Sequence, residues 1–233
     1  MSGLLTEAPR FASAALAAVA DPSKAPGMQA YMKTDMPFYG VQKAARAKIL
    51  RELAQHFPPS DRAGYEALVV ALWELPHREE KYLALGVARH FREYVVPQML
   101  PLYRGLIVEG AWWDLVDEVA THLICDLVVG HPDEVWPTVD TWIDDDDMWL
   151  RRTAIICQVG AKENTDAARL FRFCETRAFE KEFFIRKGIG WALRQHARVD
   201  PDAVARFVSE HRDQLSGLSY REATKHIGHL VMS

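Results

Sequence analysis

The feature that most constrains the fold of this chain is a repeat of helical segments. Apolar residues recur at helical spacing along almost the whole sequence. Alternate helices are expected to begin near His77, Trp112, Met148, Glu182 and Leu218. These positions lie 35, 36, 34 and 36 residues apart. A helix pair of this length cannot bury its apolar face alone, so neighbouring pairs must stack. The spacing therefore predicts an all-α fold, a curved α-solenoid of HEAT-like repeats with a concave and a convex face.

Aromatic residues mark the same period. Trp113, Trp149, Phe184 and Tyr220 lie close to four of the expected helix starts and are spaced by 36, 35 and 36 residues. A helical bundle with coincidental spacing is the alternative, but four near-equal gaps favour the repeat. If the second helix of each pair lines the concave face, functional side chains are expected near the starts of these helices.

Breaks between the helical segments agree with an all-α chain. Proline stops such as Pro58-Pro59 and Asp200-Pro201 separate the segments, and no convincing set of strands with period two is present. We expect a single HEAT-like repeat domain over residues 1–233, with residues 1–24 as an N-terminal helix or extension. The stretch Phe11–Ala20 ends in an A-x-A pattern like a signal-peptide cleavage site, but its weak hydrophobicity and the preceding Glu7 favour a helix.

Composition limits the class of protein. Of 233 residues 49% are hydrophobic and 26% charged, as in globular domains, and no apolar run approaches the roughly 18 residues of a membrane span. The three cysteines show no CxxC spacing and the nine histidines no metal-binding spacing, so we expect no disulfide framework, no metal and no cofactor. These features predict a cytoplasmic protein without a membrane partner. Because a solenoid that presents one groove to its partner works as a monomer, we also expect a monomer.

Charge is distributed unevenly along the chain. Residues 1–149 carry 13 Lys and Arg against 22 Asp and Glu, whereas residues 150–233 carry 15 against 10. The net charge of the first part is therefore −9 and that of the second +5. A basic C-terminal part is compatible with an anionic partner on one surface, and equally with a solvated face that has no partner.

Chemically notable side chains stand near the expected helix starts. Trp113 and Asp117 are four residues apart, as are Lys187 and Trp191, so each pair shares one face of a helix. Arg152 lies near the start of another such helix. If adjacent repeats stack in register, a carboxylate, two indoles and several cationic groups converge on one groove. Each feature taken alone also has a structural explanation, since tryptophans pack cores and aspartates cap helices.

Six parts of the sequence, in order and spacing, resemble the AlkD-type DNA alkylation repair family of HEAT-like DNA glycosylases. The resemblance extends from about residue 28 to the end of the chain. It rests on Tyr31-Met32-Lys33 with Phe38-x-Gly40-Val41-Gln42, Leu72-Trp73-Glu74-Leu75-Pro76, Trp112-Trp113-Asp114-x-Val116-Asp117, Trp149-Leu150-x-Arg152, Lys181-Glu182-Phe183-Phe184-Ile185-x-Lys187 through Trp191-x-Leu193-Arg194, and Leu218-Ser219-x-Arg221-Glu222-Ala223 with Lys225-His226-Ile227.

The resemblance implies a monofunctional DNA glycosylase of base excision repair. Such an enzyme hydrolyses the N-glycosidic bond of cationic N-alkylated purines, chiefly 7-methylguanine and 3-methyladenine, in double-stranded DNA and leaves an abasic site. It implies catalytic roles for Trp113 and Asp117, a place at the lesion for Trp191, and a contact of Arg152 with the phosphate at the lesion. The protein would then associate with the nucleoid when bound to DNA.

The physical chemistry of the reaction supports this assignment. An alkylated purine is already a cationic leaving group, and the positive charge passes to the deoxyribose as the bond breaks, where a fixed carboxylate can stabilise it. Indole faces attract cations. Further phosphate contacts are expected from the basic C-terminal part, and Tyr31 and Gln42 are possible contacts in the DNA groove. The expected phosphate-binding residues are Arg152, Arg186, Lys187, Arg194, Arg221 and Lys225.

Two other functions are considered. A non-catalytic relative would recognise unusual DNA shapes and bind DNA without releasing a base. A protein-interaction scaffold, a common use of α-solenoids, would show no salt-sensitive DNA binding. The acidic run Asp144–Asp147 exceeds what the family pattern needs, and we expect it to cap the helix that begins at Met148 and to face away from DNA.

Overall fold

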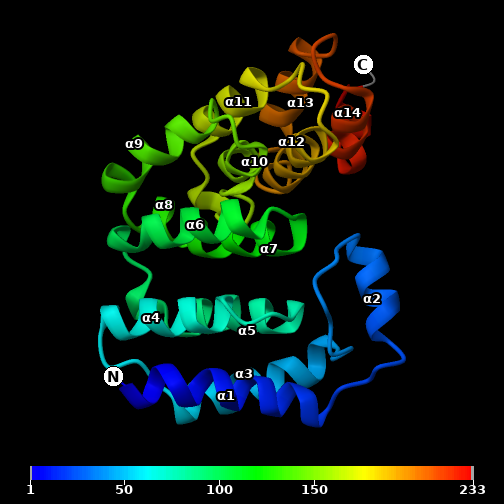
Figure 1. Ribbon diagram of the computed structural model, residues 1–233. Coiled ribbons are helices and arrows are strands. Elements are labelled where there is room, and N and C mark those ends of the chain that lie inside the picture. The colour runs from blue at the N-terminus through cyan, green and yellow to red at the C-terminus, as the bar shows by residue number, and fades with distance from the viewer. Residues whose placement is uncertain (1, 232–233) are drawn as a thin grey trace. The chain divides into compact units, whose positions relative to one another are not determined.

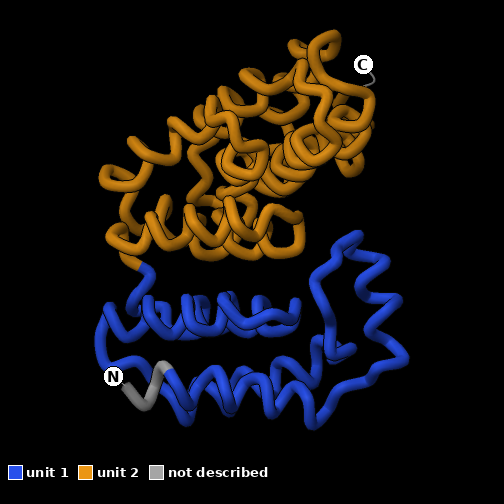
Figure 2. The backbone as a smooth tube through the Cα atoms, viewed as in Figure 1, with its two compact units in different colours: residues 1–95 blue, residues 96–233 orange. Residues whose placement is uncertain are grey.

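The computed structural model describes the backbone of residues 2–231 and the side chains of residues 6–231. Every regular element in that range is a helix (Figure 1), so the predicted all-α class is confirmed. The chain divides into two compact units, residues 1–95 and residues 96–233 (Figure 2). The expectation of one repeat domain over residues 1–233 stays a prediction.

The first unit consists of helices that pack on one another around a small apolar core. Helix α1 packs against α3 and α4, and α5 packs against α3 and α4. Leu16, Leu53, Leu72 and Leu83 are almost completely buried between them. The elements are α1 (Ser2–Ala18), α2 (Ala25–Met32), α3 (Lys43–His56), α4 (Arg62–Trp73), α5 (Arg78–His90) and the short 3₁₀ turn η1 (Arg92–Tyr94).

A buried carboxylate fixes the loop that joins α2 to α3. Glu79 of α5 accepts hydrogen bonds of 3.1, 2.9 and 2.9 Å from the backbone N–H groups of residues 39–41. Gly40 has φ +84°, and a Cβ atom there would lie 2.0 Å from the carbonyl oxygen of Asp21, so only glycine fits. The loop ends at Gln42, so the hydrogen bonds to Glu79 hold the backbone that leads into this residue.

The second unit continues the pattern of stacked helices. Tyr103, Leu115, Trp142 and Phe173 are among its most deeply buried side chains. Its elements are η2 (Pro97–Met99), α6 (Leu100–Gly110), α7 (Trp113–Glu118), the π-helical turn η3 (Val119–Ile124), α8 (Cys125–Gly130), α9 (Pro132–Trp142), α10 (Met148–Ile156), η4 (Lys162–Asn164), α11 (Ala167–Thr176), α12 (Phe183–His196), α13 (Pro201–Glu210), α14 (Gly217–Ala223), η5 (Thr224–His226) and α15 (Gly228–Val231).

The repeat inferred from the sequence is present in the structure. The helices α5, α7, α10, α12 and α14 begin at Arg78, Trp113, Met148, Phe183 and Gly217, which lie 35, 35, 35 and 34 residues apart. Each start is within one residue of the predicted position. Within the second unit, α7 packs on α10, α10 on α12 and α12 on α14. This stacking of successive repeats is that of an α-solenoid, and the predicted fold class is confirmed.

Side-chain caps define several of the helix starts. Asp147 accepts hydrogen bonds from the N–H groups of Trp149 at 2.7 Å and Leu150 at 3.1 Å, so it caps α10. The expectation that the acidic run caps this helix is thus confirmed. Two of the other acids in the run pair with arginines: Asp144 with Arg177 at 2.5 Å, and Asp145 with Arg104 at 3.5 Å.

Cys125, Cys157 and Cys174 are buried free thiols. Burial raises the pKa of Cys125 to about 11, which keeps its thiol protonated at neutral pH. Among the described residues no group of three or more His, Cys, Asp or Glu side chains could hold a metal ion. No helix in the described part of the chain has both the length and the apolar character needed to cross a membrane.

Candidate functional site

The stacking of repeats aligns charged residues at one position of successive helices. Asp117, Arg152 and Lys187 are each the fifth residue of their helices, α7, α10 and α12, and are 35 residues apart. Glu222 of α14 follows 35 residues after Lys187. Because adjacent helices pack in register, these four side chains meet in pairs across the repeats. We call Asp117, Arg152, Lys187 and Glu222 the charged row.

The first pair of the charged row is a bidentate ion pair. Arg152 donates from Nε to Oδ1 of Asp117 and from Nη2 to Oδ2, both at 2.7 Å. Its Nη1 donates to the carbonyl oxygen of Phe184. Arg152 is only 3% exposed, whereas the Asp117 side chain keeps 17% of its surface exposed. The arginine therefore lies inside the fold, and the carboxylate lies at its boundary.

A glycine in the next repeat leaves room for Arg152. A Cβ atom on Gly188 of α12 would lie 3.2 Å from Nη1 of Arg152 and 3.4 Å from Cγ2 of Ile156. The absence of a side chain at Gly188 thus leaves room for the guanidinium. The same guanidinium lies 5.9 Å from the centre of the Phe184 ring. Arg152 in this way links α7, α10 and α12.

Burial controls the ionisation of Asp117. It raises the pKa of this carboxyl above its ordinary value, while the hydrogen bonds and positive charge of Arg152 act in the opposite direction. The nearby Asp114 adds to the increase. The result is a carboxylate that is held in one orientation by two hydrogen bonds and is poorly solvated.

Trp113 lies on α7 one turn before Asp117, on the same helix face, and is half-buried. The turn after Asp117 is π-helical, and Thr121 within it donates from Oγ1 to the carbonyl oxygen of Asp117 at 2.7 Å. Single π-helical turns occur frequently at functional sites. The indole and the carboxylate expected to act together thus lie side by side on one short helix.

Three aromatic residues near the helix starts form a cluster, and two of them, Trp149 and Phe184, belong to the four expected from the spacing. The ring of Trp112 lies 5.3 Å from that of Phe184 and 6.1 Å from that of Trp149, and the latter two are 4.9 Å apart. The member contributed by the start of α7 is therefore Trp112, whereas Trp113 was the residue expected from the spacing. The adjacent tryptophans Trp112 and Trp113 indicated that an aromatic residue lies at this helix start, but the repeat period could not show which of the two joins the cluster.

The second pair of the charged row neutralises two of the expected phosphate-binding residues. Lys187 donates from Nζ to Oε1 of Glu222 at 2.5 Å, and Arg194 donates to the other oxygen. Chiefly because of Lys187, the pKa of Glu222 lies below its ordinary value. A Cβ atom on Gly190 would lie 2.5 Å from Cβ of Glu222, so this glycine permits the close approach of α14. Glu222 was not predicted as a site residue, although its 35-residue spacing was a usable signal.

The remaining predicted residues of the second unit lie on α12, α14 and η5. Trp191 is half-buried on α12, one turn after Lys187. Arg186 is also half-buried on this helix, about two turns before Arg194. The carbonyl oxygen of Arg186 accepts a hydrogen bond of 2.9 Å from Oγ of Ser219, and this bond joins α12 to α14.

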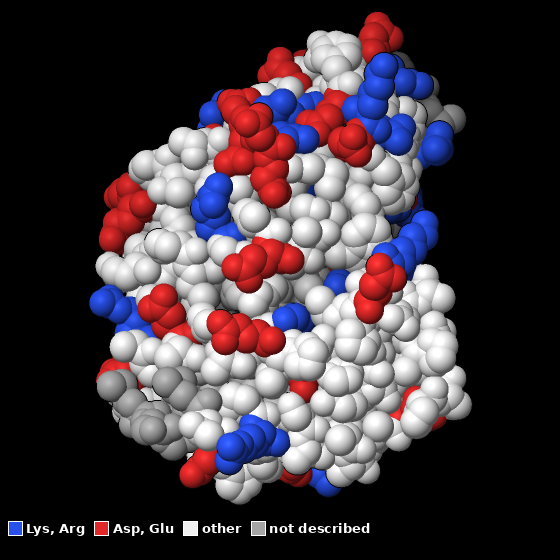
Figure 3. Space-filling view, viewed as in Figure 1, with Lys and Arg blue, Asp and Glu red and all other residues white. Residues whose placement is uncertain are grey.

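Arg221 and Lys225 are exposed near the end of the chain, on α14 and η5. On the face shown in Figure 3, lysine and arginine side chains gather near the C-terminal end, next to acidic groups. Exposed cations keep their hydration and remain available to an anionic partner, whereas Lys187 and Arg194 already share a carboxylate.

The two residues predicted as groove contacts lie in the first unit. Tyr31 on α2 is 70% exposed, and Gln42 is exposed at the start of α3. Both line a cavity of about 840 Å³, which is also lined by Lys43 and Arg46. The guanidinium of Arg46 stacks 4.4 Å from the centre of the Tyr82 ring. Aromatic and cationic side chains therefore surround this cavity.

The helical repeats are stacked, and a carboxylate is fixed beside tryptophans near the helix starts. The protein is therefore an all-α repeat protein with a polar site at the starts of its helices. The sequence model of the DNA alkylation repair enzyme family matches residues 12–227, and the chain belongs to that family. It is similar to a solved structure described as a predicted DNA alkylation repair enzyme from Enterococcus faecalis. That similarity has a TM-score of 0.82 and 26% sequence identity, and covers 89% of this chain and 96% of the other. No curated protein matches the chain.

The family relates the chain to the repair of alkylation damage in DNA, and it implies DNA as the partner. The family resemblance inferred from the sequence motifs is thereby confirmed.

Proposed function

We propose that the protein is a monofunctional DNA glycosylase that hydrolyses the N-glycosidic bond of cationic N-alkylated purines in double-stranded DNA. The observation that carries the proposal is the Asp117 carboxylate, which Arg152 holds by two hydrogen bonds of 2.7 Å beside Trp113. The proposed substrates are 7-methylguanine and 3-methyladenine, and the product is an abasic site in base excision repair.

Cleavage of the N-glycosidic bond of an alkylated purine requires a fixed negative charge near the sugar more than it requires a general acid for the base. Alkylation at a ring nitrogen makes the purine a cationic leaving group, so that protonation of the base is unnecessary. Positive charge then develops on the deoxyribose, and the Asp117 carboxylate stabilises it and orients the attacking water. Because Arg152 fixes the carboxylate before the reaction, little reorganisation is needed as the charge develops.

Aromatic faces supply the preference for a charged lesion. The indoles of Trp113 and Trp191 attract the cationic nucleotide and the developing sugar cation, by about 0.5–2 kcal/mol each depending on desolvation. A neutral, undamaged base gains none of this attraction. Selectivity for alkylated purines therefore follows from charge, without a deep pocket shaped to one base.

Arg152 has a positioning role in this proposal. Three of the five N–H groups of its guanidinium are used by Asp117 and Phe184. A contact with the lesion phosphate would use the remaining two. Affinity for the DNA backbone would come chiefly from the exposed cations of α14 and η5, with smaller contributions from α12 and with two groove contacts in the first unit. These residues are Arg221 and Lys225, then Arg186, Lys187 and Arg194, and finally Tyr31 and Gln42.

The test is the release of bases from methylated duplex DNA. Purified protein is mixed with the DNA, and the released bases are separated by chromatography. We expect 7-methylguanine and 3-methyladenine above a blank without protein, and an abasic site without strand cleavage. Absence of both bases from the supernatant would refute the glycosylase proposal, and DNA binding without release would favour a non-catalytic relative that recognises DNA shape.

Two variants separate catalysis from folding and binding. Asp117→Asn should abolish release while DNA binding persists, because the amide has no charge to stabilise the sugar cation. Glu118→Gln is the matched control, since Glu118 is the next carboxylate on α7 and lies near His122 at 3.7 Å rather than Arg152. Full activity of Asp117→Asn would show that the mechanism is wrong.

A further inference from the structure

Trp191 lies on α12 between two cations that bind the same carboxylate of another helix. Lys187, Trp191 and Arg194 follow one another at intervals of four and three residues, so their side chains share one side of α12. Glu222 of α14 accepts from Nζ of Lys187 at 2.5 Å through one oxygen and from Nη1 of Arg194 through the other. The carboxylate therefore joins the turn before Trp191 to the turn after it. We call Lys187, Glu222 and Arg194 the Glu222 bridge.

The backbone of α14 lies against α12 at the residue before Trp191. A Cβ atom on Gly190 would lie 2.5 Å from Cβ of Glu222 and 2.9 Å from the carbonyl oxygen of Ser219. Ser219 in addition donates from Oγ to the carbonyl oxygen of Arg186 at 2.9 Å. Because both contacts hold the backbone of α14, the Glu222 side chain extends from a fixed position.

Helix geometry places the Glu222 bridge between α14 and Trp191. Successive residues of an α-helix are turned by about 100°, so Gly190 and Trp191 point in different directions. Lys187 and Arg194 fall between these directions, at about 60° and about 40° from Gly190. Their side chains, joined by the carboxylate, therefore form a wall beside the indole and exclude the rotamers that would turn it toward α14.

Charge holds the Glu222 bridge together. The hydrogen bond and charge of Lys187, with a smaller contribution from Arg194, keep the pKa of Glu222 below its ordinary value, although partial burial acts in the opposite direction. The carboxylate is therefore ionised at neutral pH, and hydrogen bonds between ionised groups are stronger than those between neutral ones. A glutamine at this position would keep one oxygen acceptor but lose the charge and the second oxygen.

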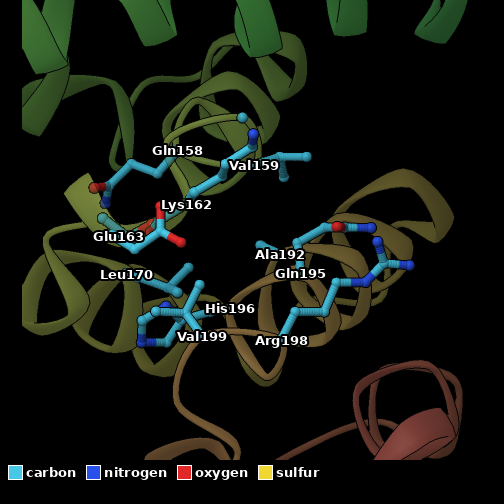
Figure 4. A pocket seen from close by; sticks show the side chains of 12 residues that line it. Gln158, Val159, Lys162, Glu163, Leu170, Ala192, Gln195, His196, Arg198 and Val199 are labelled. Carbon is cyan, nitrogen blue, oxygen red and sulfur yellow. The ribbon is translucent and has the colours of Figure 1, made fainter.

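The opposite side of α12 borders a cavity. Ala192 and His196 lie on that side and line a space of about 260 Å³ (Figure 4). The ring of His196 packs against that of Phe171, with the ring centres 5.8 Å apart. Trp191 is not part of the cavity lining. The indole is therefore restricted on the side of the Glu222 bridge and not by the cavity wall.

We propose that Glu222 is a positioning residue that fixes the orientation of Trp191 by means of Lys187 and Arg194. A cation is attracted to an indole when it lies over the face of the ring, so the orientation of the ring decides the strength of the attraction. A ring that is already oriented loses less side-chain entropy when a ligand binds. The effect of Glu222 on base release rests on the proposed function, whereas the orientation of the ring does not.

The orientation of Trp191 is measured without DNA, by fluorine NMR of the full chain labelled with 5-fluorotryptophan. The chain has seven tryptophans, and the resonance that is missing in Trp191→Leu is that of Trp191. We expect a single line in the wild type and a broadened or split line in Glu222→Gln, because the ring gains a second orientation. Loss of the nearby charge alone would shift the line and leave its width unchanged. A Trp191 line of wild-type width in folded Glu222→Gln overturns the proposal.

Asp140→Asn is the matched control. Asp140 of α9 also binds two cations of another helix, Arg169 at 3.2 Å and Arg172 at 2.6 Å on α11, but it lies outside the charged row. This variant should leave the Trp191 line and the rate of base release at their wild-type values. If it broadens the line as much as Glu222→Gln does, the effect is one of general packing and the proposal fails. Should Glu222→Gln not fold, Arg194→Gln takes its place, with the same broadening expected and an unchanged width overturning the proposal.

The single-turnover rate of base release tests whether Glu222 acts through Trp191. Glu222→Gln should lower the rate by roughly threefold to thirtyfold, the range that one contact between a cation and an indole supplies, while DNA binding does not weaken. In a Trp191→Leu protein the same substitution should change the rate by less than roughly twofold, because the ring that Glu222 positions is absent. Independent losses in the double variant overturn the proposal.

The two measurements distinguish this proposal from the proposed function. A wild-type protein that releases no base, but whose Trp191 line broadens in Glu222→Gln, would refute the glycosylase and support the positioning role. Base release together with a Trp191 line that Glu222→Gln leaves unchanged would have the opposite meaning.

Discussion

Breaking the ion pair between Asp117 and Arg152 should cost stability, and removing both partners should restore much of the loss. In Asp117→Asn the guanidinium keeps one oxygen acceptor but loses its counter-charge, and Arg152 is only 3% exposed to compensating water. In Arg152→Met the carboxylate loses both hydrogen bonds of 2.7 Å. In the double variant neither charge remains, so neither is left buried without a partner.

The structure sets the size of the effect. Removal of one partner from a buried ion pair costs about 3–5 kcal/mol. Since the Asp117 side chain keeps 17% exposure and asparagine retains one acceptor, we expect about 1–3 kcal/mol for Asp117→Asn. Burial raises the pKa of Asp117 and so opposes the stabilisation that the intact pair provides. The double variant should therefore approach the wild type, with a coupling energy of about 1–3 kcal/mol.

The assay is urea denaturation, together with thermal unfolding, of the wild type, both single variants and the double variant. A loss of about 1 kcal/mol corresponds to a decrease in Tm of about 2–4 °C for a chain of this size. The comparison pair is Arg172 and Asp140, 2.6 Å apart but with the arginine 52% exposed, for which we expect a coupling of about 0–1 kcal/mol. Additive losses for Asp117 and Arg152, within about 0.5 kcal/mol, would refute the reasoning.

Three further predictions concern α12 and the charged row. Gly190→Ala should destabilise the protein by about 1–3 kcal/mol in urea, because its Cβ atom would lie 2.5 Å from Cβ of Glu222; an unchanged midpoint would contradict this. Glu222→Gln should release Lys187 and Arg194, so that DNA binding becomes tighter and more salt-dependent in a fluorescence titration, and weaker binding would count against it. The rate of base release should fall as the pH drops through the raised pKa of Asp117, because the ionised carboxylate is the active form. The midpoint of this decrease should lie above the usual pKa range of an aspartic acid. A rate that stays constant down to the usual aspartic acid range would argue against the assignment.

The helix starts could be predicted because two patterns in the sequence indicate the same positions. One is the spacing of apolar residues, and the other is the recurrence of aromatic residues. A period still leaves an uncertainty of one residue, and one residue turns a helical side chain by about 100°. This explains the difference between Trp112 and Trp113. Trp112 precedes the helix, with φ −155° and ψ 145°, and its ring packs on Trp149 and Phe184. Trp113, the first residue of α7, shares a face with Asp117.

The pairing within the charged row was harder to predict. Register places Asp117, Arg152, Lys187 and Glu222 at equivalent positions, but the sequence does not show how closely the helices approach. That distance depends on small residues elsewhere, and Gly188 leaves the space that Arg152 occupies. Arg152 was expected to contact a phosphate, whereas its burial depends on a residue in another repeat that the sequence pattern does not relate to it.

The sequence pattern suggested one set of cations both for the site around Asp117 and for binding the DNA backbone, whereas the charged row separates these two roles. Arg152 and Lys187 each have a carboxylate partner in an adjacent repeat, so the row adds no net charge to attract DNA. In the proposed function, attraction to the DNA backbone would then come chiefly from cations outside the row, such as the exposed Arg221 and Lys225. In the proposed glycosylase, the ion pair can hold Asp117 in a fixed position whether or not DNA is bound, because its partner is an internal arginine that does not have to leave it to contact a phosphate.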